Sequence, residues 1–391
     1  MSVIDILARA RAWTDARAVT MRERATLSSD PPTAFGIAPI KLVSEEHVQA
    51  IAYGFLDAMP SFVTRWHPLG RDSSELVPFA IALDAYLMQM LSKGFLPRIW
   101  ISDTATMDLL ETMGHRFHSN QHASVEVRRM GKELRLLSLE GSIPGQQVVA
   151  VAHTLLMGAM STGQTGAEDA HLGALMAWVN PRPGQDTVKL AAERALIPAT
   201  AMLDRQNDDL VEALRRQAKG SGRRAALARK RIRRVLEQGA GAQWNLLIEA
   251  RDAYLSLGLS ADHLEPLVEG SRERLRFGMS TFPEPGRSPT ALLAELDRSE
   301  HAIALVEDLD LADYGTRERA RRSGHVFAAK VLTWNPPDPR ENGFIMQLHA
   351  GQEILRVRRG SMIRLLDGKI RAIVSDVEAH ENGGYLLTVK V

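Results

Sequence analysis

The spacing of apolar residues changes near Gly324, and this change constrains the fold more than any other feature of the sequence. Upstream of it, apolar residues recur mainly at helical intervals; downstream, they form short runs separated by turns that contain glycine. A chain of 391 residues also exceeds what one hydrophobic core usually organises. We therefore expect a mainly helical, multidomain protein that ends in a small β-rich domain.

Breaks in the pattern suggest three domains. Segment 180–184, which contains two prolines and a glycine, interrupts the first helical region. We expect a helical domain with a small sheet at 1–180, a helical bundle with a basic segment at 185–322, and a small OB-like or SH3-like β-barrel at 324–391. Such barrels serve many functions, so the architecture alone implies no activity.

Local spacing predicts the individual elements. Helices are expected at 2–26, 44–59, 78–91 and 148–160, and short strands at 98–102 and 134–139. From 186 to 309 one helix follows another, and the glycines at 220–222 and 239–241 are expected to separate them. Six strands are expected at 326–334, 344–349, 354–358, 362–366, 370–377 and 385–391.

The absence of cysteine excludes disulfides, thiolate nucleophiles and zinc sites built on sulfur, and it fits a reducing compartment. Residues 1–25 lack the basic start, apolar stretch and cleavage site of a secretion signal. The most apolar stretch, 148–160, is too short to span a membrane. We therefore expect a cytoplasmic protein without a membrane-spanning segment.

Positive charge is concentrated in one segment, although the formal net charge of the whole chain is only +1. Between Arg215 and Arg234, ten of twenty residues are Lys or Arg and none is acidic. Such a density suits a nucleic-acid backbone, because each cation that neutralises a phosphate releases a counterion. The residues expected to contact phosphate are Arg215, Arg216, Lys219, Arg223, Arg224, Arg229, Lys230, Arg231, Arg233 and Arg234.

The C-terminal domain carries a second basic group. Strand alternation would place Arg356 and Arg358 on one face and apolar residues on the other. The phosphate contacts expected from this group are Arg321, Arg322, Arg356, Arg358, Arg364, Lys369 and Arg371. The aromatic rings that could stack on the bases of a single strand, or fill the core of the domain instead, are those of Phe327, Trp334, Phe344 and Tyr385.

An acidic stretch follows the basic segment and could neutralise the positive charge of that segment. Its carboxylates belong to Glu295, Asp297, Glu300, Glu307, Asp308, Asp310 and Asp313. If the basic helix docks on these residues, the two segments form an internal latch and no polyanion-binding surface remains.

Patterns typical of catalysis or metal binding are sparse. The sequence contains no P-loop, no dinucleotide-binding glycine motif after a strand and no nucleophile elbow, so we expect no cofactor. The spacing of His115, His118 and His122 could bring three imidazoles to one helix face, which makes them the candidates for a metal site. Exposed histidines also cluster in many proteins without binding a metal.

Three functions remain open. The first is a nucleic-acid-binding accessory protein, without an ATPase motif of its own, that holds DNA or RNA through the basic helix and the basic barrel. Its N-terminal domain would bind a protein partner such as a motor or nuclease. The second is a scaffold or adaptor whose charges pair internally or with another protein, and the third is a metal-dependent enzyme of unknown type. We favour the first because two basic clusters flank one acidic segment.

Overall fold

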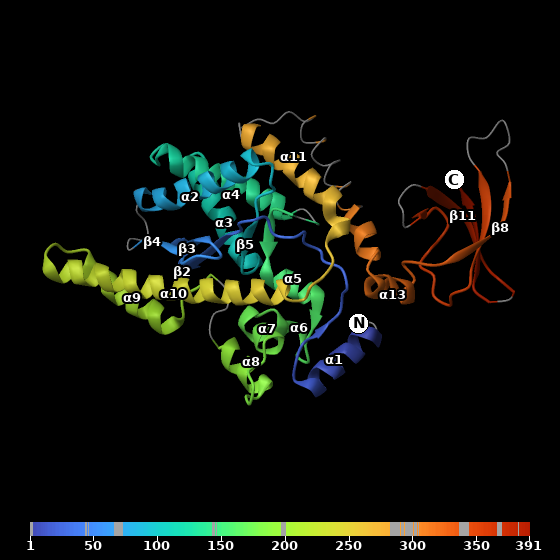
Figure 1. Cartoon of the computed structure of the whole chain (residues 1–391), viewed down its shortest axis with the longest axis horizontal. Coiled ribbons are helices and arrows are strands. Elements are labelled where there is room, and N and C mark those ends of the chain that lie inside the picture. Colours follow the sequence, from blue (N-terminus) through green and yellow to red (C-terminus); the bar gives the residue numbers. More distant parts are fainter. Residues whose placement is uncertain are drawn as a thin grey trace. The chain divides into compact units, whose positions relative to one another are not determined.

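The structure is a computed structural model that describes residues 3–43, 45, 47–65, 73–142, 145, 147–196, 201–281, 290, 293, 300, 303, 305–335, 344–365, 370–381 and 383–391 (Figure 1). The chain forms two compact units. The larger unit comprises 8–21 and 25–302, and the smaller comprises 1–7, 22–24 and 303–391. The expectation of a mainly helical chain with small sheets is confirmed. The three-domain layout is not confirmed, because segment 180–184 lies inside the larger unit.

A five-stranded mixed sheet forms the centre of the larger unit. Its strands are β2 (Phe35–Lys41), β3 (Val48–Phe55), β4 (Ser61–Thr64), β5 (Ile99–Ile101) and β6 (Val149–Val151). β2, β3 and β4 form an antiparallel meander, whereas β5 and β6 run parallel to β2, which gives the order β4-β3-β2-β5-β6. β2 and β3 are buried on both faces over most of their length. The sheet is therefore an inner layer.

Helices cover both faces of this sheet (Figure 1). They are α2 (Val77–Ser92), α3 (Thr104–Phe117), α4 (Val125–Ser142), α5 (Ala152–Ala159), α7 (Leu172–Val179) and α10 (Arg223–Leu255). On one face, α2, α3 and α4 enclose a core that includes Phe35 and Ile101. On the other face, α5, α7 and α10 enclose a second core that includes Ile40, Trp100 and Trp244.

Further helices and two short strands are described up to residue 281. They are α1 (Val3–Asp15), β1 (Val19–Thr20), η1 (Ser74–Leu76), β7 (Met160–Ser161), α6 (Gly166–Asp169), α8 (Thr187–Ala195), α9 (Arg205–Ala218), η2 (Asp262–Leu264) and α11 (Glu265–Thr281). β1 and β7 pair antiparallel. The side chains of Thr165 and Glu168 cap the start of α6 reciprocally.

Two sequence predictions upstream of residue 180 are wrong, and two others are wrong in part. The helix expected at 2–26 ends at Asp15, and β1 follows it at Val19–Thr20. Segment 44–59 contains β3 rather than a helix, because a strand buried on both faces lacks the alternation that would identify it. Segment 134–139 lies in α4, whose apolar run is long because α4 packs against α2, α3 and α11 at once. Segment 148–160 begins with β6 before α5 starts at Ala152.

Gly239 and Gly241 do not separate two helices, since α10 continues through both for 33 residues. A Cβ atom on Gly239 would lie 2.6 Å from Cδ1 of Leu203 and 3.0 Å from Cδ1 of Ile40. At Gly241, the nearest atom would be Cζ of Phe62 at an ordinary 3.7 Å. Gly239 therefore allows α10 to approach β2 closely.

Alanine at these two glycines should have opposite effects. Both substitutions gain about 1 kcal/mol of helix propensity, but only Gly239→Ala places a methyl group against buried side chains, at about 1–3 kcal/mol. We expect Gly241→Ala to raise the free energy of unfolding and Gly239→Ala to lower it, as measured by urea denaturation. Equal effects would contradict the close approach at Gly239.

Segment Ser74–Ser92, with a mean hydropathy of 1.2, is the one described helical stretch long and apolar enough to cross a membrane by length and composition. Phe79, Leu83 and Leu87 of this segment are buried in the core that α2, α3 and α4 enclose with the sheet. These side chains belong to one of the two cores of the larger unit.

The smaller unit contains an antiparallel sheet. Its elements are α13 (Tyr314–Arg322), β8 (Ala329–Asn335), β9 (Ile345–Ala350), β10 (Met362–Arg364), β11 (Arg371–Ala379) and β12 (Tyr385–Lys390). The strand order is β10-β11-β12-β9-β8, and β8 does not pair with β10 in the described residues. Five of the six expected strands are present, while 354–358 is irregular. The antiparallel sheet is thus confirmed, but its closure into a barrel is not.

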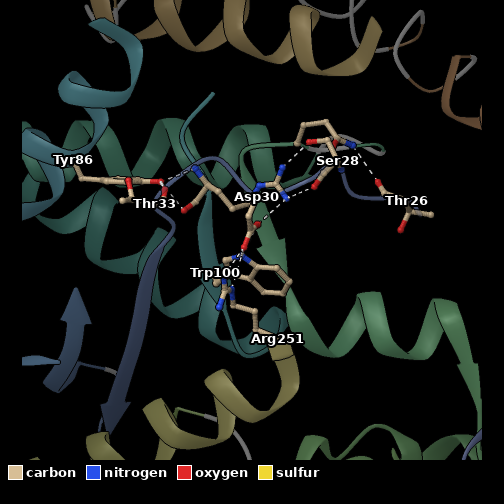
Figure 2. Close-up of polar contacts among 9 residues, drawn as sticks. Thr26, Ser28, Asp30, Thr33, Tyr86, Trp100 and Arg251 are labelled. Carbon is tan, nitrogen blue, oxygen red and sulfur yellow. Dashed lines mark hydrogen bonds and ion pairs between the residues drawn. The ribbon is translucent and has the colours of Figure 1, made fainter. Parts of the chain in front are cut away.

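Asp30 joins three parts of the larger unit (Figure 2). Its carboxylate accepts hydrogen bonds from Nε1 of Trp100 on β5 (3.1 Å) and from Nε and Nη2 of Arg251 on α10 (3.0 and 2.9 Å). The guanidinium of Arg98 lies 3.6 Å from this carboxylate and donates to Ser28. Burial lowers the pKa of Arg98 to about 10, and the charge of Asp30 opposes this effect. The network ties the C-terminal half of α10 to the sheet.

Candidate nucleic-acid interface

The basic segment forms the end of a helical hairpin made by α9 and α10. α9 starts at Asp204, whose side chain accepts a hydrogen bond from the backbone of Asn207, and α10 starts after Gly222, which has a φ of 92°. The loop at 219–222 is short, as is usual between antiparallel neighbouring helices. Ala218, Ala225 and Ala228 are buried between the helices, and their small side chains allow close packing.

Nine of the ten cations predicted in this segment are exposed. We call them the basic hairpin end: Arg216, Lys219, Arg223, Arg224, Arg229, Lys230, Arg231, Arg233 and Arg234. Arg229 donates to the carbonyl oxygens of Ala218 (3.1 Å) and Gly220 (3.2 Å) and so closes the loop. The side chains of the other eight form no ion pair or hydrogen bond with any residue that the structure describes.

Arg215 does not belong to this surface, which corrects its predicted role. Its side chain is 10% exposed, and Nη1 lies 2.5 Å from Oε1 of Glu45. Nη2 donates to Oε1 of Gln49 at 2.8 Å. Arg215 therefore fixes α9 against the segment that leads into β3, and its charge is neutralised there.

The electrostatics of the basic hairpin end favour an anionic partner. No acidic residue lies between Arg215 and Arg234, so the repulsion between the cations is not relieved within the segment. The N-terminus of α10 adds the partial positive charge of its helix dipole beside Arg223 and Arg224. A phosphate backbone would relieve this repulsion.

The second basic group is divided in the structure. Arg364 is paired with Glu307 (3.3 Å) and Asp308 (2.9 Å), and Arg321 is paired with Glu318 (3.0 Å), so the charges of these two arginines are neutralised locally. The exposed members outside these ion pairs are Arg322, Arg356, Arg358 and Arg371, and Arg356 lies 3.5 Å from a ring nitrogen of His325. Lys369 lies outside the described residues.

Some carboxylates of the acidic stretch form contacts within the smaller unit. Asp310 pairs with Arg22 at 2.6 Å. Asp313 caps α13 and accepts a hydrogen bond from the backbone of Glu23 at 2.9 Å. Glu300 is exposed, whereas Glu295 and Asp297 lie outside the described residues.

The aromatic residues of the C-terminal region give little support for stacking on bases. Phe327 packs against the core of the smaller unit, and the hydroxyl of Tyr385 donates to the carbonyl oxygen of Glu353 at 3.2 Å. Phe344 is 41% exposed. The side chain of Trp334 lies outside the described part of the chain.

The histidine candidates do not form a metal site. His115 lies 3.6 Å from Glu111, and Nδ1 of His118 lies 2.8 Å from the backbone oxygen of His115. In the described parts of the chain, no group of three His, Asp or Glu side chains is placed to hold a metal ion. The structure therefore gives no support for the metal-dependent reading.

A hollow of about 810 Å³ lies between α1, β1 and the end of α10. Its volume is within the range of small-molecule sites. Charged side chains of both signs line it, including Arg11, Arg17, Glu249 and Asp252. Arg11 already pairs with Asp15, and Glu249 with Arg194. The lining gives no sign of one class of ligand.

Sequence reasoning missed two features of the interface. Leu227 is 58% exposed among the cations, although its apolar side chain suggested no surface role. The Asp30 network, which holds α10, was also missed. Comparison with known proteins adds no further information, since no protein-family model, curated protein or solved structure matches the chain.

Proposed function

We propose that this protein binds nucleic acid by contacting the phosphate backbone with the basic hairpin end. The observation that carries the proposal is that eight exposed cations have no partner among the described residues and lie on one helical hairpin. Arg215 and Arg364, by contrast, are paired with carboxylates, so their charges are not available to a polyanion.

The anchoring of α10 supports this proposal. Trp244 is buried in the core, Gly239 lies against β2, and Arg251 is bound by Asp30. A rigid helix holds its cations in place before a partner arrives, which reduces the entropy lost on binding.

In this proposal the protein is a cytoplasmic accessory factor that lacks an ATPase motif of its own. The C-terminal sheet, as part of a small barrel, supplies a second contact through Arg322, Arg356, Arg358 and Arg371. The region before residue 180 binds a protein partner, such as the motor or nuclease that the accessory factor would serve.

A scaffold with internally paired charges is the alternative. It would leave the protein with negligible affinity for DNA or RNA. Glu307 and Asp308 pair with Arg364, and Asp310 pairs with Arg22, within the smaller unit, which leaves fewer carboxylates for such a latch.

Charge reversal of three hairpin cations tests the proposal. In the triple variant Lys230→Glu, Arg231→Glu and Arg234→Glu, all three side chains are exposed and none closes the hairpin loop. We expect affinity for labelled DNA or RNA to fall at least about tenfold and the slope of log K against log salt to flatten by about 3. Fluorescence anisotropy at several salt concentrations measures both.

The matched control reverses three exposed cations elsewhere in the larger unit, Lys132, Arg182 and Lys189, and so changes the net charge equally. This control should bind like the wild type. Equal losses in both variants would mean that only net charge matters, and absence of binding by the wild type at low salt would refute the proposal. Anionic vesicles, tested in parallel, would reveal a lipid surface as the partner instead.

A further inference from the structure

We infer that the polymer is duplex DNA and that the N-terminal part of α10 enters its major groove. This inference rests on the proposed function and concerns the same basic hairpin end. Its basis is the distribution of the cations around the helix, the absence of stacking side chains, and one exposed leucine.

The cations surround the free side of α10. Each residue advances an α-helix by about 100°. If Arg223 defines zero, the buried residues Ala228, Ile232 and Ala225 lie at about 140°, 180° and 200°, which is the side covered by α9. Apart from Arg229, which closes the hairpin loop, the exposed cations run from Arg233 at about 280° through Lys230, Arg223, Arg234 and Arg231 to Arg224 at about 100°.

An arc of about 180° is wider than contact with one backbone requires. A surface that follows a single strand needs a narrow stripe of cations. A helix between two phosphate walls instead needs cations on both flanks, and Arg233 and Arg224 occupy opposite flanks of α10. The charge distribution therefore fits a groove.

The dimensions agree. Residues 223–234 extend for about 17 Å along the helix axis, and an α-helix with its side chains is about 10–12 Å wide. The major groove of B-DNA is about 12 Å wide and 8.5 Å deep. In Figure 1 this end of α10 lies with α9 at the edge of the larger unit, beyond the label of β4, so the sheet does not cover it.

Other polymers fit less well. No Phe, Tyr, Trp or His occurs from 205 to 243, so the hairpin offers no ring on which the bases of a single strand could stack. The major groove of duplex RNA is deep and narrow, and side chains cannot reach into it. Duplex DNA requires no stacking rings, and side chains can reach into its major groove.

Leu227 gains a role in this arrangement. It lies at about 40°, between Arg234 and Arg231, in the middle of the cationic arc. A helix in the major groove would turn this side chain toward the base edges, where thymine presents its methyl group. An apolar contact there explains why a leucine that is 58% exposed stands among cations.

The test compares the binding of the full chain to four labelled probes at one low salt concentration. They are a DNA duplex of about 24 base pairs, a little over two helical turns, the RNA duplex and the DNA single strand of the same sequence, and the DNA duplex with glucosylated hydroxymethylcytosine. The glucose fills the major groove and leaves the phosphates unchanged. We expect the plain DNA duplex to bind at least about tenfold more tightly than the other three.

A minor-groove ligand, netropsin, serves as the control and should not displace the protein. Equal affinity for all four probes, or unchanged binding after glucosylation, would overturn the major-groove inference while leaving nucleic-acid binding intact. Absence of binding to every probe would refute the proposed function and this inference with it.

Discussion

Asp30→Ala is expected to lower the free energy of unfolding by about 3–5 kcal/mol, because it removes the main partner of a buried positive charge. The side chain of Arg98 is only 2% exposed, and its guanidinium would keep its bond to Ser28 but lose the carboxylate. The indole nitrogen of Trp100 would lose its acceptor at the same time. Urea denaturation at neutral pH measures the effect.

Asp252→Ala is the matched control, since Asp252 contacts the same arginine of α10. Its carboxylate lies 3.3 Å from Nη1 of Arg251, but its side chain is 62% exposed. Exposed ion pairs contribute about 0–1 kcal/mol, so we expect little change. If Asp30→Ala were equally mild, the network would not hold α10 in the way described.

The Asp30 network also shows why part of the fold could not be predicted from sequence. Asp30 and Arg251 are 221 residues apart, and Arg215 and Glu45 are 170 apart. Neither pair leaves a local pattern, because the packing of helices on the sheet creates the contact. From the sequence alone, we therefore predicted that Arg215 lies on the basic surface. Its contacts with partners that are distant in the sequence bury it instead.

Local patterns were sufficient where one side of an element faces solvent. α9 and α10 alternate buried alanine or leucine with exposed cations, so the basic hairpin end could be predicted apart from Arg215. β2 and β3 are covered on both faces and show no such alternation, so these two strands were missed, whereas the strand expected at 98–102 is present as β5. The arc of cations around α10 was not recognised either, because it depends on which side α9 covers.

Glu133→Gln should stabilise the protein at alkaline pH. Glu133 on α4 is 4% exposed at its side chain, and neither of its carboxylate oxygens receives a hydrogen bond within the described residues. Asp84 on α2 shares the cation of Arg129 with it, which lies 2.7 Å from Asp84 and 3.4 Å from Glu133. Burial, and next the charge of Asp84, raises the pKa of Glu133 to about 8.

The sign of the pH dependence follows from this shift. The folded state holds the proton of Glu133 up to about pH 8, whereas the unfolded chain releases it near its ordinary value of about 4.3. Stability contributed by the protonated form is therefore greatest below about pH 4 and is lost progressively as the pH rises to about 8, by a few kcal/mol in all. The amide introduced by Glu133→Gln does not ionise, so the variant should match the wild type near pH 4 and exceed its free energy of unfolding at pH 8.5. Glu126→Gln, an exposed position on the same helix, is the control and should follow the wild type. Parallel stability curves for Glu133→Gln and the wild type from pH 5 to 8.5 would show that Glu133 is already ionised in the folded protein.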